Sequence, residues 1–124
     1  MDTRKKIIPL REAAALLEEH LWIAAVGRFD PMTATEAARL AELGKNRKLL
    51  VAVLEEQDAL LDASARAALV AALRDVSAVT IASPEAWQAT IKDSPVMSVV
   101  QDPSGDAARR NAFIEMVLTK QQLR

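Results

Sequence analysis

The chain has no cysteine and only one histidine among its 124 residues. These absences exclude disulfides and thiolate metal sites, and they argue against a metal site built from histidines. Aromatic residues make up only 3% of the chain, too few for a platform that stacks single-stranded nucleic acid. The formal net charge of −1 gives no overall basic field to attract nucleic acid or a membrane surface. We therefore expect no bound metal, no nucleic acid and no membrane partner.

Long apolar runs are also missing. No such run follows the charged N-terminal residues, so the sequence predicts neither a signal peptide nor a transmembrane helix, and the expected location is the cytoplasm. The length favours one domain over residues 1–124. Hydrophobic residues make up 51% of the chain, which is ample for a packed core.

Hydrophobic periodicity predicts alternating helices and strands. Continuous apolar runs of strand length occupy residues 21–26, 49–54, 78–82 and 96–100. Helical patterns cover residues 10–19, 65–76 and 84–92. Another helical segment includes Ala37, Leu40 and Ala41 and ends at Gly44. A final helical segment begins near Asp106. In the helix over 65–76 we expect an inward face made of Leu69, Ala72, Leu73 and Val76.

Strands that are separated by single helices run parallel, because each crossover reverses the chain direction twice. The sequence therefore predicts a three-layer α/β sandwich with helices on both faces of a parallel sheet. In such sheets ligands bind beyond the carboxyl ends of the strands. We expect a site at the turns over residues 27–36 and 101–106. Asp102 follows the fourth strand there, although turn formation alone would also explain it.

The turn over residues 27–36 reads GRFDPMTATE and joins a strand to a helix. It resembles the G-x-F-D-x-x-[H/T]-x-G-H signature of the cytidylyltransferase-like nucleotidyltransferases. The segment from Phe29 to Thr33 is similar to that of phosphopantetheine adenylyltransferases. Much of residues 6–100 resembles the nucleotidyltransferase domain of the bifunctional heptose-phosphate enzymes. The resemblance implies a Rossmann-like domain with four parallel strands in the order 3-2-1-4.

In that family the turn and its motif side chains hold the phosphates of the nucleotide at a helix N-terminus. The resemblance then makes Gly27 and Phe29 part of the turn, Asp30 its support, and Thr33 the first polar phosphate ligand. Two positions depart from the signature. Thr35 stands where the family has glycine, and Glu36 stands where it has its second histidine. A carboxylate at Glu36 would repel a triphosphate by about 1–4 kcal/mol, depending on the local dielectric.

Residues 33–36 also fit a capping box, in which Thr33 and Glu36 each bind the other's backbone amide. A helix start of this kind satisfies itself and leaves fewer donors for phosphate. In addition, residues 106–124 lack the Ser/Thr-rich segment with a basic residue that closes on the triphosphate in the family. These features make capping a stronger interpretation of Thr33 and Glu36 than phosphate binding.

The leading hypothesis is a degenerate nucleotidyltransferase-like domain that has lost nucleotidyl transfer and acts as a binding or assembly module. Its partner would be an unknown protein, a second copy of the chain in a homodimer, or a weakly bound nucleotide. It would have no catalytic residues and no cofactor. The alternative is a divergent active nucleotidyltransferase, which would use Mg²⁺ with CTP or ATP and transfer the nucleotide to a small phosphorylated acceptor. Under either hypothesis the candidate nucleotide-binding residues are Gly27, Phe29, Asp30, Thr33, Glu36 and Asp102.

Overall fold

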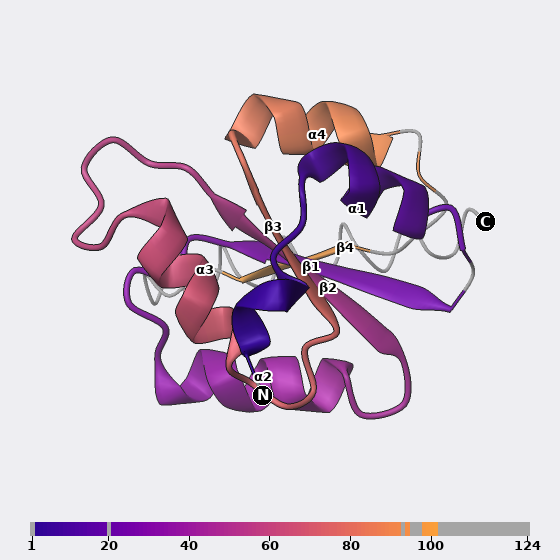
Figure 1. Cartoon of the computed structure of the whole chain (residues 1–124), viewed down its shortest axis with the longest axis horizontal. Coiled ribbons are helices and arrows are strands. Elements are labelled where there is room, and N and C mark those ends of the chain that lie inside the picture. The colour runs from indigo at the N-terminus through magenta and orange to yellow at the C-terminus, as the bar shows by residue number, and fades with distance from the viewer. Residues whose placement is uncertain (1, 20, 93, 95–97, 102–124) are drawn as a thin grey trace, which may run out of the picture.

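A computed structural model describes residues 2–19, 21–92, 94 and 98–101. Within these ranges helices and parallel strands alternate (Figure 1). The elements are η1 (Thr3–Lys6), α1 (Leu10–Leu16), β1 (Trp22–Gly27), α2 (Ala34–Leu43), β2 (Lys48–Leu54), α3 (Ala63–Ala71), β3 (Ala78–Ala82), α4 (Pro84–Lys92) and β4 (Ser98–Gln101). Among the helices described here, none combines the length and the apolar character that crossing a bilayer requires.

Strands β1, β2 and β3 form a parallel sheet in which β2 lies between the other two. In this register Val51 of β2 lies between Ala25 of β1 and Val79 of β3. The backbone of the short strand β4 pairs in parallel with the other side of β1. The predicted parallel α/β arrangement with helices on both faces is confirmed, and it is consistent with a Rossmann-like fold.

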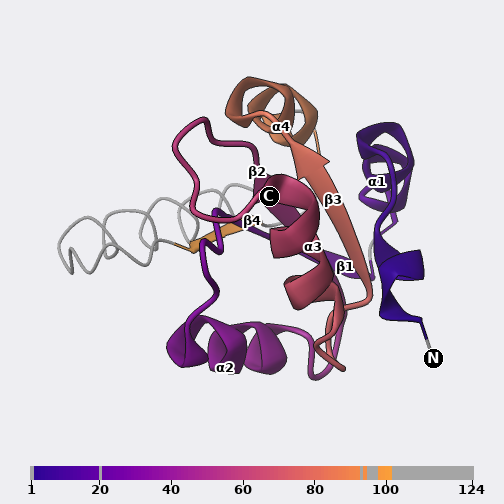
Figure 2. The same ribbon diagram turned by 60° about the vertical axis from the view of Figure 1, so that its left-hand side comes forward.

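Strands β1, β2 and β3 are buried on both faces, which explains their nearly continuous apolar sequences. Figures 1 and 2 show α1 and α4 on one face of the sheet and α2 and α3 on the other. Alternate strand residues divide between two cores. Ala24, Leu50 and Ala78 pack with Trp87 of α4, whereas Ala25, Val51 and Val79 pack with residues of α2 and α3.

The N-terminal segment protects the outer edge of β3. The amide of Ile8 donates to the carbonyl of Val79 at 2.8 Å, and Ile7 forms a parallel bridge with the same residue. One residue earlier in the chain, Lys6 Nζ donates to the carbonyl of Leu73 at 3.0 Å. The segment therefore pairs with an edge that would otherwise be open to another chain, and it also ties η1 to the end of α3.

The predicted inward face of the third helix was only partly right. Val76 is buried and Leu73 packs against the core, but both follow the helix, and Leu69 and Ala72 are exposed. The helix spans Ala63–Ala71 rather than residues 65–76, and Leu69 is 47% exposed. Its buried residues are Arg66, Ala67, Val70 and Ala71. Because this helix is apolar almost all round, hydrophobic periodicity could not identify which face packs on the sheet. Apart from Gln101, which ends β4, the predicted turn over residues 101–106 and the final helix lie outside the described residues.

Gly44 follows α2, as predicted, but for a different physical reason. Its φ of −86° is accessible to any residue, so no left-handed conformation requires glycine here. Instead, the backbone of Asp75 passes so close that a Cβ at Gly44 would collide with its carbonyl oxygen. The glycine therefore permits close contact between the turn after α2 and the turn after α3.

Candidate functional site

The turn after β1 redirects the chain from the sheet toward α2, and Phe29 is its pivot. Phe29 has a φ of 54°, in a region that non-glycine residues adopt only rarely. Its side chain is fully buried in the core beneath α2 and α3. The peptide bond between Asp30 and Pro31 is cis. Burial of a large aromatic ring helps to offset the backbone strain at Phe29, which is on the order of 1–3 kcal/mol.

Asp30 holds the loop between β2 and α3. Its carboxylate accepts the amides of Leu60 and Leu61 at 2.6 and 2.8 Å. Desolvation alone would raise the pKa of Asp30. The hydrogen bonds from Leu61 and Leu60, together with the positive charge of Arg66, outweigh desolvation and leave the pKa below its usual value. The expected support role of Asp30 thus takes a specific form: it fixes the neighbouring loop.

Arg66 is the central polar residue of this region, and sequence reasoning missed it. Its side chain is only 1% exposed, and its guanidinium donates to three backbone carbonyls. Nη1 binds the carbonyls of Arg28 and Leu54 at 2.8 Å each, and Nε binds that of Leu61 at 3.0 Å. One side chain therefore joins the ends of β1 and β2 to the loop before α3. A single charged residue in an otherwise apolar helix was the signal that could have identified it.

The N-terminus of α2 carries the predicted capping box, and this prediction is confirmed. The amide of Glu36 donates to Thr33 Oγ1 at 3.1 Å, and the amide of Thr33 donates to Glu36 Oε1 at 2.9 Å. Glu36 is only 5% exposed, so its side chain folds back onto the helix start rather than projecting into solvent. Its second oxygen, Oε2, is buried and has no hydrogen-bond partner among the described residues. Two backbone donors at this helix start are therefore already occupied.

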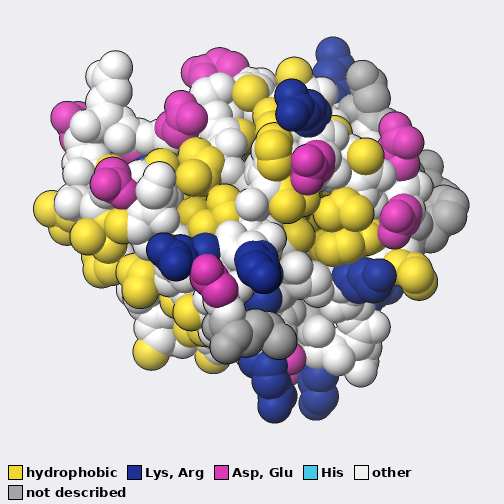
Figure 3. Space-filling view, viewed as in Figure 1, with side chains coloured by type: hydrophobic (Ala, Val, Ile, Leu, Met, Phe, Trp, Pro, Cys, Tyr) yellow, Lys and Arg dark blue, Asp and Glu magenta, His cyan; other side chains and the backbone are white. Residues whose placement is uncertain are grey.

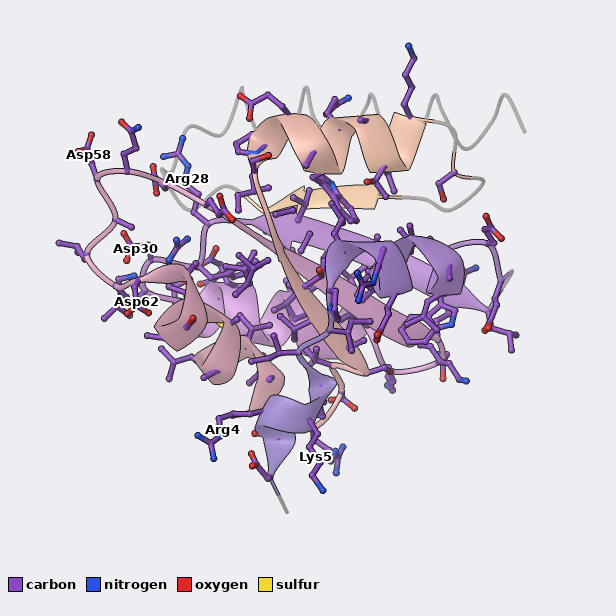
Figure 4. The ribbon with its side chains drawn as sticks, turned by 45° about the horizontal axis from the view of Figure 1, so that its top comes forward. Arg4, Lys5, Arg28, Asp30, Asp58 and Asp62 are labelled. Carbon is purple, nitrogen blue, oxygen red and sulfur yellow. The ribbon has the colours of Figure 1, made fainter. Side chains whose placement is uncertain are left out.

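Charged side chains surround the carboxyl ends of β1 and β2 (Figure 4). Arg28 Nη1 lies 3.0 Å from Glu56 Oε1, and this ion pair connects the β1 turn to the loop after β2. Glu55 and Asp58 in that loop are exposed, as expected for a solvated acidic segment. Since Arg28 is paired with Glu56 and Arg66 with carbonyl groups, the exposed part of this rim is mainly acidic.

The structure brings five of the six candidate residues together. Gly27 ends β1, Phe29 and Asp30 form the turn, and Thr33 and Glu36 form the start of α2. Asp102 lies outside the described residues. Within those residues, no group of three or more histidine, aspartate or glutamate side chains could hold a metal ion.

Comparisons with known proteins add no family to this geometry. No protein-family model matches the chain, and no curated protein matches it. The cytidylyltransferase-like interpretation therefore depends on the turn motif, on the sequence resemblance over residues 6–100 and on the α/β arrangement.

Proposed function

We propose that this protein is a degenerate member of the cytidylyltransferase-like nucleotidyltransferases. In this proposal the complete sheet has four strands in the order 3-2-1-4, an arrangement supported by the backbone pairing of β4 with β1. The domain keeps the turn of the family but carries out no nucleotidyl transfer. It acts instead as a binding or assembly module.

The observation that carries this proposal is the closed helix start at α2. A phosphate at a helix N-terminus needs free backbone N–H groups and a positive end of the helix dipole. Here the amides of Thr33 and Glu36 already donate within the capping box. The carboxyl group of Glu36 also lies at the positive end of this helix, where it disfavours a second anion.

The surroundings of the turn support the same conclusion. Thr35 is exposed and adds a branched side chain at the position where the family signature has glycine. The neighbouring loop contributes Glu55, Glu56 and Asp58, and Arg28 is already paired with Glu56. A nucleoside triphosphate would therefore approach a rim with excess negative charge, which weakens its association.

Calorimetric titration with ATP and with CTP, each with and without Mg²⁺, tests the proposal. We expect dissociation constants no better than about 1 mM, equivalent to at most about 4 kcal/mol of binding. We also expect no release of pyrophosphate with sugar phosphates or alcohol phosphates. Micromolar affinity or pyrophosphate release would instead favour the divergent active nucleotidyltransferase.

A double variant, Thr35→Gly with Glu36→His, tests the physical reason. It removes the branched side chain and opens the capping box, so triphosphate binding is expected to strengthen without full turnover. The matched control is Glu42→His, which changes the same residue type on an exposed position of α2. An equal increase in triphosphate affinity in the control and in the double variant would show that net charge, rather than the helix start, limits binding.

A further inference from the structure

Helix α3 presents an apolar face to solvent. Arg66 is its only charged residue, and that side chain is buried on the opposite side. The outward positions, which we call the α3 face, are Ala65, Ala68, Leu69 and Ala72. Leu69 is 47% exposed, and Leu60 in the preceding loop is 82% exposed. Figure 3 shows hydrophobic side chains gathered over α3 and this loop, at the left of the view. A helix that is apolar on all sides is normally covered by another element.

The two ends of the α3 face carry opposite charges. The acidic end consists of Glu55, Glu56, Asp58 and Asp62 in the loop before α3, where Glu56 is paired with Arg28. The basic end consists of Arg4, Lys5 and Arg74. Arg4 pairs there with Asp2 at 3.1 Å and Arg74 with Asp75 at 3.8 Å, so three cations outnumber two carboxylates. Arg74 is 93% exposed, and the hydrogen bond from Lys6 to Leu73 holds η1 beside this end of the helix. In Figure 4, α3 runs between Asp58 and Asp62 on one side and Arg4 and Lys5 on the other.

We propose that the α3 face binds a second copy of this chain, with the two α3 helices antiparallel across a twofold axis. In that arrangement the acidic end of each copy lies against the basic end of the other. The twofold axis therefore produces the same favourable pairing of charges at both ends of the interface. The antiparallel helix dipoles also attract. Alanine at Ala65, Ala68 and Ala72 leaves room for the two helices to approach closely, with Leu69 supplying the larger apolar contact.

Charge complementarity selects this occupant. A wholly acidic partner segment would be repelled by the loop before α3. A wholly basic one would meet Arg4, Lys5 and Arg74, which outnumber the two carboxylates paired with them. A second copy in the antiparallel orientation places its basic end opposite the acidic end and its acidic end opposite the basic end. The helix is only about 13 Å long at 1.5 Å per residue, so the flanking loop and η1 must contribute to the contact. Such an interface is smaller than the usual 800 Å² or so per partner, and we expect a dissociation constant in the micromolar range.

This inference gives a specific form to the assembly module of the proposed function and rests on that part of it. Sedimentation equilibrium of the full chain over a wide concentration range provides the test. We expect a monomer–dimer equilibrium that Leu69→Lys weakens by about tenfold or more, since a charge would be buried at the centre of the contact. The matched control is Leu21→Lys, because Leu21 is 66% exposed at the start of β1 and lies outside the α3 face. Circular dichroism checks that each variant is folded.

Charge reversal tests the orientation. Asp58→Lys alone and Arg74→Glu alone are each expected to weaken the dimer several-fold, because each places like charges opposite one another. The variant that combines both changes is expected to return to within about twofold of the original dissociation constant. A combined variant no tighter than the single variants would overturn the antiparallel arrangement.

The remaining outcomes separate this inference from the nucleotide proposal. A chain that stays monomeric at every concentration would overturn the dimer and leave the α3 face to a different partner, without changing the nucleotide titration. A dimer that Leu21→Lys weakens as much as Leu69→Lys would also overturn it. Tight ATP or CTP binding by a protein that dimerises as expected would overturn only the loss of nucleotide binding.

Discussion

Arg66 offers the sharpest test of how this fold is held together. Arg66→Met keeps much of the side-chain volume but removes every donor from the carbonyls of Arg28, Leu54 and Leu61. Hydrogen bonds from a charged donor contribute about 1.5–3 kcal/mol each. The three bonds measure 2.8, 2.8 and 3.0 Å, so their loss alone would cost several kcal/mol.

An opposing effect reduces that figure. Within the described part of the chain, the buried guanidinium donates to carbonyl groups and to no carboxylate, so replacing it also removes the cost of desolvating a charge. Solvent can reach the freed carbonyls in part, because Leu54 and Leu61 are only half-buried. We therefore expect Arg66→Met to lower the free energy of unfolding by about 3 kcal/mol. The stability of Arg66→Lys should lie between those of the original chain and Arg66→Met, since one ammonium group cannot reach carbonyls on three segments.

Urea denaturation followed by circular dichroism measures these changes, with Arg47→Met as the control. Arg47 is exposed and lies outside the α3 face and its two charged ends, so its replacement should change stability by less than about 0.5 kcal/mol. Amide exchange at Leu60 and Leu61 should also accelerate in Arg66→Met, because their loop loses one of its two anchors. If Arg66→Met were as stable as the original chain, the three hydrogen bonds would merely balance desolvation and the reasoning would be refuted.

Three other predictions follow from single contacts. Thr33→Ala should lower the free energy of unfolding by about 1 kcal/mol, as cap losses do, whereas Thr33→Ser should change it little; thermal denaturation distinguishes the two. Gly44→Ala should cost about 1–3 kcal/mol in urea, because its Cβ would collide with the carbonyl of Asp75, and a cost near zero would contradict that close contact. The lowered pKa of Asp30 means that the folded state binds fewer protons at this group than the unfolded state does. Its contribution to stability should therefore be present above about pH 4 and disappear as the pH falls through the folded-state pKa. The difference in free energy of unfolding between the original chain and Asp30→Asn should therefore narrow as the pH falls below about 4. A difference that stays constant in urea titrations down to about pH 3 would count against this role of the Asp30 carboxylate.

Local sequence patterns were enough for the three strands β1, β2 and β3, for the start of α4 and for one part of the site. The apolar runs located β1, β2 and β3 to within about one residue, because strands buried on both faces need continuous hydrophobic sequence. Ser83 and Pro84 located the start of α4, where Ser83 Oγ accepts the amide of Ala86. The capping box was predictable because both of its hydrogen bonds join residues three positions apart.

Only the tertiary structure decided the contacts between distant segments. Asp30 binds amides 30 and 31 residues further along the chain, and Arg66 reaches a carbonyl 38 residues before it. The sequence named Asp30 as a support but could not show its partners, and it gave Arg66 no role. The inward face of α3 was likewise undecided, because its apolar residues surround the whole helix. The physical reason is the same in each case: spacing along the chain specifies hydrogen bonds within a helix turn, whereas packing on the sheet determines which distant backbone groups a side chain meets.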